Sequence, residues 1–241
     1  MAGPRTFLFL ALLTVAWAAP GHAGEPYHDA AYAGGAQKIP GAVFCAYYDL
    51  GGEGVAFHDT DATNQGSGKL NPADGSYLNE FRRHEALDIS YTKQVPDRES
   101  PANKVVPPLG LLYVGWNDPG EWFNVTVETP AAGAYVADLL YTANRDASFS
   151  ISVNGGAEAH VPLASTFDPA ETIAWRQWHH WNVARDVVTL VLPPDRSVLT
   201  FRVVAGGNFN LATLVFRPAG APRTGPDILA IKTARPGEAA R

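Results

Sequence analysis

The amino-acid sequence predicts an all-β protein, with a single domain built as a β-sandwich. Two patterns lead to this prediction: apolar and polar residues alternate within short runs, and clusters of turn residues separate these runs. Composition agrees, because 23 glycines, 19 prolines and only 17% charged residues leave few helix-forming segments among the 241 residues. No convincing amphipathic helix is found, so a sandwich is favoured over mixed folds.

The predicted strands lie mainly in the second half of the chain. In residues 121–129 (EWFNVTVET), the apolar side chains alternate with polar ones, which predicts a strand with two different faces. Further strands are predicted at 134–142, 148–155, 183–192, 197–204 and 210–217. Residues 143–147 (ANRDA) have the composition of a hairpin turn, and Pro193 to Arg196 form another turn. Residues 58–107 are rich in turn residues, with one short strand predicted at 87–92.

The first 23 residues predict a signal peptide. Arg5 supplies a positive start, and the apolar run at 7–17 has the length of a signal-peptide core but is too short to span a bilayer. Small residues allow cleavage after Ala18 or after Ala23, and Pro20, which ends the apolar run, favours Ala23. The sequence therefore predicts a secreted or periplasmic protein with no membrane span.

The remaining chain divides into three predicted parts. Residues 24–38 are small and polar and are expected to form a flexible lead. Residues 39–217 contain the predicted strands and form the folded domain. Residues 218–241 are rich in Pro, Ala and Gly and are expected to form a mostly disordered tail, within which 228–231 is apolar enough to dock.

Charge and cysteine content exclude several functions. The net charge is −6 and no run of Lys or Arg is present, so nucleic acid and anionic membranes are not expected partners. The single cysteine, Cys45, cannot form an internal disulfide, and its apolar setting (VFCAYY) predicts a small buried side chain rather than a catalytic thiol.

The run AWRQWHHWN (174–182) is the most unusual stretch. On a single strand Trp175 and Trp181 would share one face and Trp178 would take the other, so the three cannot all enter one core. We expect Trp181 to be buried and Trp178 to sit in a loop. His179 and His180 are adjacent and would face opposite ways on a strand, which argues against a zinc site.

Three longer stretches together resemble carbohydrate-binding modules of families 6 and 35. They are IPGAVFCAYYDLGGEGVAFHDTD (39–61), LYVGWNDPGEWFNVTVETPAAGAYVADLLYTAN (112–144) and WHHWNVARDVVTLVLPPDRSVLTFRVVAGGNFNLATLVF (178–216). No single motif in them is specific to these modules, but the occurrence of all the motifs in this order along residues 39–217 is a stronger signal. The resemblance implies a β-jelly-roll of the galactose-binding-like type that binds polysaccharide without cutting it.

The resemblance also implies a set of site residues. In these modules two aromatic rings flank a sugar and an Asn bonds its hydroxyls, at loops on one end of the sandwich. The matching positions are Trp116, after a Gly, Trp178, the first Trp of W-x-x-W, and Asn210 of FNL. Trp175 and Asn208 are further candidates. An indole presents a flat apolar surface to the C–H face of a pyranose, and an amide can both donate to and accept from hydroxyls.

The chain departs from these modules at their structural calcium site. The family usually places two Glu in the first strand and an Asp after the FNL motif. Here the corresponding residues are Phe44, Ala46 and Ala212, which offer none of the oxygen ligands that calcium requires. We therefore expect apolar packing at this site and no cofactor. Glu53, Asp59 and Asp61 could bind a metal elsewhere, although solvated loop carboxylates are the favoured interpretation.

Taken together, these observations predict an exported, non-catalytic protein that binds a polysaccharide or glycan. A separate secreted glycoside hydrolase is a candidate partner. Two alternatives stay open: a structural or adhesive surface protein that has the fold without a sugar site, and a hydrolase or lyase. The enzyme is disfavoured because neither Asp118 with Glu121 nor Glu85 with Asp88 has neighbours that would separate two carboxyl pKa values, and no G-x-S-x-G motif is present. We predict no catalytic and no metal-binding residue.

Overall fold

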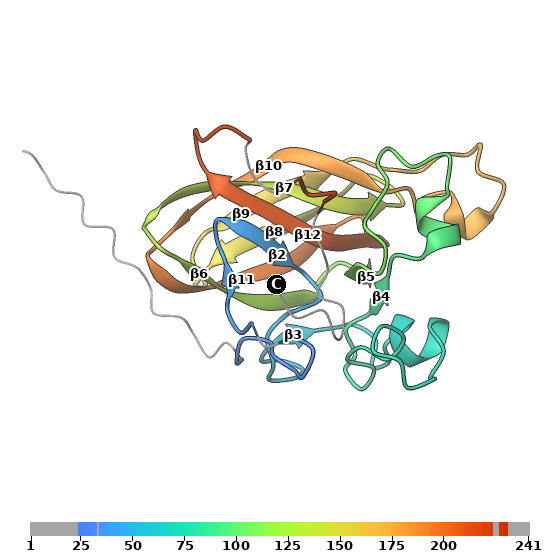
Figure 1. Ribbon diagram of the computed structural model, residues 1–241, viewed down its shortest axis with the longest axis horizontal. Coiled ribbons are helices and arrows are strands. Elements are labelled where there is room, and N and C mark those ends of the chain that lie inside the picture. The colour runs from blue at the N-terminus through green and yellow to red at the C-terminus, as the bar shows by residue number, and fades with distance from the viewer. Residues whose placement is uncertain (1–23, 33, 224–226, 231–241) are drawn as a thin grey trace, which may run out of the picture.

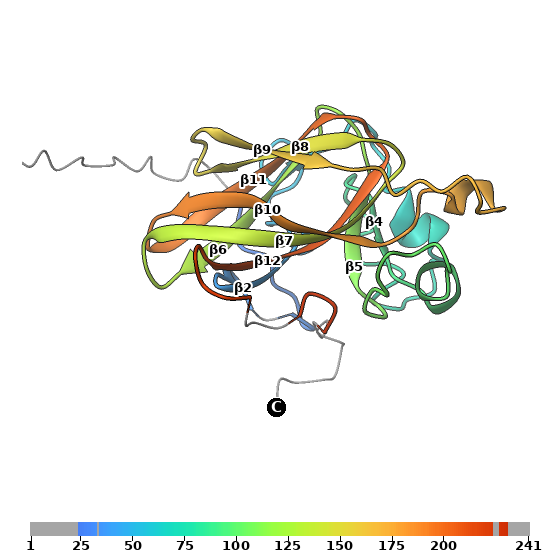
Figure 2. The same cartoon turned by 90° about the horizontal axis from the view of Figure 1, so that it is seen from above.

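The protein is a β-sandwich of jelly-roll type, as the sequence predicts. The computed structural model describes residues 24–32, 34–223 and 227–230. Two sheets of six strands lie face to face (Figures 1 and 2). In the first sheet the strand order is β1-β6-β11-β8-β9, with β3 also paired to β6. In the second it is β10-β7-β12-β5-β4, with β2 also paired to β12.

The strands of each sheet have the following bounds. The first sheet contains β1 (Gln37–Lys38), β3 (Phe57–His58), β6 (Trp122–Thr129), β8 (Ala147–Val153), β9 (Glu158–Leu163) and β11 (Asp195–Ala205). The second contains β2 (Gly41–Phe44), β4 (Ile89–Tyr91), β5 (Leu112–Asn117), β7 (Gly133–Ala143), β10 (Asn182–Leu192) and β12 (Phe209–Pro218). Three short helical turns, η1 (Gly66–Leu70), η2 (Gln94–Arg98) and η3 (Ala174–Arg176), lie in the connections. All of the strands predicted from alternation are present.

The predicted hairpin at 143–147 is wrong. The strands on either side of it, β7 and β8, belong to different sheets, so this turn is an arch that crosses the sandwich. Turn residues specify that the chain reverses but not which partner the next strand finds. The arch is favoured because it lets the apolar faces of the two strands pack on each other, with Leu139 of β7 and Phe149 of β8 both in the core.

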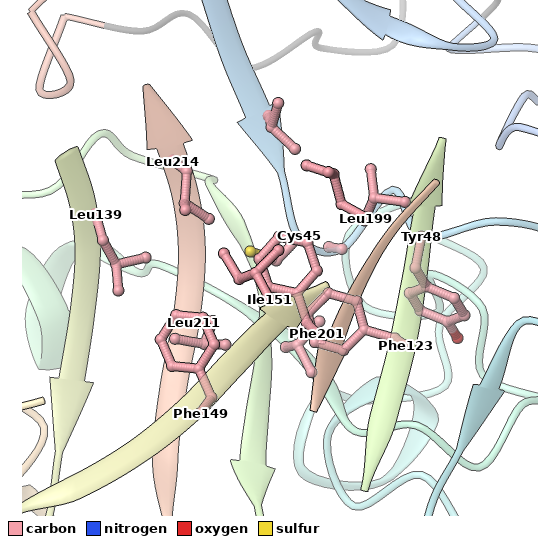
Figure 3. Packing of buried hydrophobic residues seen from close by; sticks show 14 of the residues in the cluster. Cys45, Tyr48, Phe123, Leu139, Phe149, Ile151, Leu199, Phe201, Leu211 and Leu214 are labelled. Carbon is pink, nitrogen blue, oxygen red and sulfur yellow. The ribbon is translucent and has the colours of Figure 1, made fainter. Parts of the chain in front are cut away.

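The main core fills the space between the sheets (Figure 3). Phe123 and Phe201 stack with their ring centroids 4.8 Å apart, and Leu139 and Leu214 reach in from the opposite sheet. Each such buried side chain contributes roughly 1.5–3 kcal/mol to stability. Cys45 is fully buried in this core, and burial raises the pKa of its thiol, so the prediction of an unreactive apolar role is confirmed.

A smaller apolar cluster lies on the outer face of the second sheet. It contains Leu111, Tyr113, Leu140, Trp181, Ala212 and Ile228. Trp181 is completely buried there, as predicted, and its indole Nε1 donates to Asp97 at 3.2 Å. Ile228 is 1% exposed, so the C-terminal segment 227–230 docks on the sheet.

The segment 24–38 was expected to be a flexible lead, but its described residues pack on the sandwich. Tyr27 is buried and stacks on Tyr47, with ring centroids 5.4 Å apart. Gln37–Lys38 forms β1, which pairs in parallel with β6. The composition is small and polar, yet its two tyrosines find aromatic partners, which composition alone does not reveal.

The predicted signal peptide, residues 1–23, lies outside the described residues. Within the part of the chain that the structure describes, no helix is long and apolar enough to cross a bilayer.

Candidate functional site

The site is built around a β-bulge between β5 and β12. Phe209 pairs with Asn117 and Leu211 pairs with Val114, so two residues of β5, Gly115 and Trp116, face the single residue Asn210 of β12. An extra residue of this kind bends the strand and redirects side chains, which is why bulges are common beside functional sites. Here the bulge brings the predicted Trp116 and Asn210 together at one end of the sandwich.

Trp116 adopts an unusual backbone conformation within this bulge. Its φ is +52°, in the left-handed region that bulky side chains seldom occupy. Such a conformation costs on the order of 1–3 kcal/mol and persists only where the surrounding structure imposes it. The result is a half-buried indole that leaves the plane of the sheet. A strained aromatic residue at a bulge points to a role in binding.

Asn210 forms the polar floor of the site. The residue is 1% exposed, and its Nδ2 donates to Thr142 Oγ1 at 2.9 Å. Its Oδ1 is buried and has no hydrogen-bond partner among the described residues. Gly115 makes room for this oxygen, because a Cβ at Gly115 would lie only 2.8 Å from it. An unpartnered buried acceptor is costly, so a ligand hydroxyl that donates to it would be favoured.

The connection between β9 and β10 forms one wall. Trp178 lies in a loop, as predicted, and is half-buried. Its carbonyl accepts a hydrogen bond from Thr166 Oγ1 at 2.7 Å, and Thr166 O in turn contacts His180 Nδ1 at 3.0 Å. Trp175 lies on η3 and is 57% exposed. The neighbouring histidine, His179, is buried and packs edge-on against the Trp178 ring, with the ring centroids 5.4 Å apart.

The turn η2 forms the opposite wall. Asp97 is buried, and its Oδ1 lies 2.8 Å from His179 Nδ1. Burial alone would raise the pKa of Asp97, but the approach of His179 and bonds from the Lys93 amide and Trp181 hold it below its usual value. Lys93 is half-buried and its Nζ donates to Asn71 Oδ1 at 2.8 Å. The two walls are therefore joined by a buried carboxylate (both lie at the same end in Figures 1 and 2).

These residues enclose a pocket of about 450 Å³. It is lined by Leu70, Lys93, Pro96, Asp97, Tyr113, Trp116, Trp175, Trp178, His179 and Asn210. Four of the five residues proposed from sequence are thus brought together. The fifth, Asn208, lies instead in the turn before β12 and does not line the pocket. Most of the surface offered to a ligand is aromatic or aliphatic, which suits the C–H face of a sugar.

Sequence reasoning missed the side of the pocket formed by residues 70–97. Lys93, Pro96 and Asp97 lie in the turn-rich part of the chain, where no periodicity indicates which side chains face inward. Tyr113 lies in the stretch 112–144 that resembles the modules but was not proposed as a site residue, and His179 was considered as a zinc ligand, which its spacing argued against. The weak available signal was the Lys93 and Asp97 pair itself, two charged residues four apart around a proline.

Phe44, Ala46 and Ala212 pack among apolar side chains. Ala46 and Ala212 are fully buried, and Phe44 packs against both apolar clusters. Elsewhere, burial raises the pKa of Asp59 and of Asp88 to about 7, with further contributions from Glu121 and Asp61. No cluster of His, Cys, Asp or Glu in the described ranges has the geometry to hold a metal ion.

A second hollow, of about 590 Å³, lies on the outer face of the second sheet beside the docked C-terminal segment. Several of its charged groups are paired within the protein. Asp138 binds Arg185 at 2.8 Å and Arg223 at 3.1 Å, and Asp186 binds Arg223 at 2.8 Å. This hollow is lined by Arg185, Arg217 and Arg223 and by no tryptophan, whereas three tryptophans line the aromatic pocket.

No protein-family model matches the chain, and no curated protein matches it. Solved structures do. CsCBM6-3 from Clostridium stercorarium, in complex with cellobiose, is 9% identical over 77% of this chain and 99% of that one, with a TM-score of 0.45. A family 35 carbohydrate-binding module from Clostridium thermocellum is 23% identical over 45% and 78%, with a TM-score of 0.36. The GH26-CBM35 β-(1,4)-mannanase of Podospora anserina is 12% identical over 58% and 27%, with a TM-score of 0.37. Modules of families 6 and 35 are thus among the solved structures that this chain resembles, as its motifs indicated.

Proposed function

We propose that this protein is an exported, non-catalytic glycan-binding protein whose ligand enters the pocket between Trp116 and Trp178. One observation carries the proposal: two half-buried indoles line a pocket together with Asn210, whose Oδ1 is buried and has no hydrogen-bond partner among the described residues. A pyranose offers what this arrangement lacks, an apolar face for the rings and a hydroxyl for the acceptor.

The absence of catalysis is part of the proposal and has its own support. Hydrolysis of a glycosidic bond requires two carboxyl groups about 5–9.5 Å apart. Among the residues that line the pocket, Asp97 is the one carboxylate, and its oxygens already accept from the Lys93 amide at 2.6 Å and from Trp181 at 3.2 Å. It is buried beneath His179 and serves to hold the walls together.

Affinity gel electrophoresis tests the proposal. Residues 24–241 are run through native gels that contain cellulose derivatives, xylans, mannans, galactans or algal glycans, and each mixture is assayed for new reducing ends. We expect one glycan to retard the protein without cleavage. Trp116→Ala and Trp178→Ala are each expected to weaken binding by roughly tenfold or more, since stacking on one ring contributes about 1–3 kcal/mol.

The matched control is Trp122→Ala. Trp122 is half-buried on β6 of the first sheet, away from the pocket, so this variant should keep full retardation. Cleavage products would replace the proposal with an enzyme. A lack of retardation by every glycan would favour a structural or adhesive protein.

A further inference from the structure

Trp175 is the most exposed indole beside the pocket. The side chain is 57% exposed, whereas Trp178 is half-buried and Trp181 is completely buried. Single exposed apolar side chains are normal on protein surfaces, but apolar side chains that gather at a cleft mark a contact with another molecule. Trp175 lines the aromatic pocket from its outer side. It is therefore placed where a ligand leaves the pocket.

The loop that carries Trp175 is held in place by a dense set of internal bonds. Glu171 is 8% exposed and pairs with Arg176 at 2.7 Å, and its carbonyl accepts from Gln177 Nε2 at 3.1 Å. The Asp168 amide donates to the Gln177 carbonyl at 2.7 Å. The exposed ring is thus presented by an ordered turn, which lowers the entropy lost when a ligand binds to it.

Trp175 and Trp178 are arranged around the same buried ring. The centroid of His179 lies 6.3 Å from that of Trp175 and 5.4 Å from that of Trp178. His179 itself is anchored to Asp97 at 2.8 Å. Because both indoles contact one fixed neighbour, they form two adjacent platforms of the pocket, of which Trp178 is half-buried and Trp175 is exposed. Across the pocket, Leu70 is 62% exposed, so the rim is apolar on both sides.

We propose that Trp175 is an outer subsite, and that the ligand is a chain of at least two sugar units. One unit lies in the pocket with Trp178, and its neighbour along the chain stacks on Trp175. This inference rests on the proposed glycan-binding function. It adds that the protein recognises an oligosaccharide or polysaccharide segment in preference to a single sugar, and that a residue of η3 gives this preference.

Isothermal titration calorimetry with sugars of increasing length tests the inference. The probes are glucose, xylose, mannose and galactose, each with its β-linked disaccharide and trisaccharide. For the series that binds, we expect the disaccharide to bind the unaltered protein roughly tenfold more tightly than the monosaccharide. Trp175→Ala should lose this gain and keep the monosaccharide affinity. Trp178→Ala should weaken all three sugars.

Two controls keep the outcomes distinct. Ile173→Ala removes another exposed side chain of the same loop that does not line the pocket, and it should behave as the unaltered protein. Trp175→Phe keeps an apolar ring and should retain part of the gain. Equal affinity for one and two sugar units, or a gain that survives in Trp175→Ala, overturns the outer subsite and leaves the pocket intact. Failure of every sugar and every polysaccharide to bind overturns the proposed function itself.

Discussion

The two ends of the run 174–182 place the same side chain in opposite environments. Trp181 is fully buried, its ring meets Tyr113 edge-on at 5.3 Å, and its Nε1 donates to Asp97. Trp178 and Trp175, three and six residues earlier, line the pocket instead. Strand β10 begins only at Asn182, so these two rings are held by a loop and can leave the sheet. The comparison teaches that one tryptophan-rich run can pack in the core at one end and line a pocket at the other, where we propose that a glycan binds.

Of the substitutions that test this comparison, replacement of Trp181 should have the largest effect on stability. Trp181→Ala removes the largest fully buried side chain and leaves the Asp97 carboxylate short of a donor, so we expect a loss of about 3–5 kcal/mol. The melting temperature should fall by about 10 °C or more. Trp178→Ala should change stability by less than about 1 kcal/mol while removing glycan binding.

Thermal and urea unfolding, followed by tryptophan fluorescence and circular dichroism, measure both variants. Trp181→Phe serves as the milder control, because it keeps an aromatic ring in the cluster but loses the bond to Asp97. An equal destabilisation by Trp178→Ala and Trp181→Ala would mean that the whole run belongs to the core.

Much of this arrangement could be predicted from the sequence. Alternation located the strands because each has one face in the core, as Phe123 and Val125 show. The order of motifs indicated Trp116, Trp178 and Asn210, which the pocket brings together. The spacing of the three tryptophans already indicated that, on a single strand, at least one of them would lie outside the core.

The rest depends on contacts between distant segments. The 143–147 arch and a hairpin use the same turn residues, so only the pairing of β7 and β8 with other strands separates them. Lys93 and Asp97 enter the site because Asp97 meets His179, 82 positions later in the chain, and no local pattern encodes that contact. Trp116 was expected at a turn, but its left-handed φ arises from the bulge opposite Asn210.

A smaller substitution beside the pocket should lower glycan affinity. Gly115→Ala removes no atom of the pocket, but its new Cβ would lie 2.8 Å from Asn210 Oδ1 and 3.1 Å from the Tyr113 ring. The amide must then turn or shift, which moves its Oδ1, an acceptor without a hydrogen-bond partner among the described residues. We expect glycan affinity to fall roughly tenfold, the value of one misplaced hydrogen bond.

Calorimetry on Gly115→Ala and on Asn210→Ala measures this effect. Similar losses in the two variants would show that Gly115 acts through Asn210. Gly133→Ala, at the start of β7, is the matched control, because an added Cβ there has no contact closer than 3.8 Å. Unchanged affinity in Gly115→Ala would show that the position of the Asn210 oxygen does not matter for binding.

Two buried carboxylates, Asp97 and Asp88, give the smallest effect and carry opposite signs. Asp97, under Trp181, has a lowered pKa, so it stabilises the fold above its ordinary pKa and loses this contribution only in strong acid. Asp88, whose carbonyl accepts from the Gly115 amide at 2.9 Å, has its pKa raised to about 7, chiefly by burial. A raised pKa means that the folded state binds more protons than the unfolded state between about pH 4 and pH 7. Stability therefore falls as pH rises through this window.

We expect the melting temperature to be about 2–4 °C lower at pH 8 than at pH 5. Asp59, also raised to about 7, acts in the same direction, whereas the lowered pKa of His180 opposes it. Asp88→Asn isolates the carboxylate, because an amide oxygen can still accept the bond from the Gln65 amide but carries no charge. The difference between pH 5 and pH 8 should shrink in this variant and persist in Asp186→Asn, whose carboxylate has a lowered pKa. An unchanged pH dependence in Asp88→Asn would show that burial does not raise the pKa of this carboxylate.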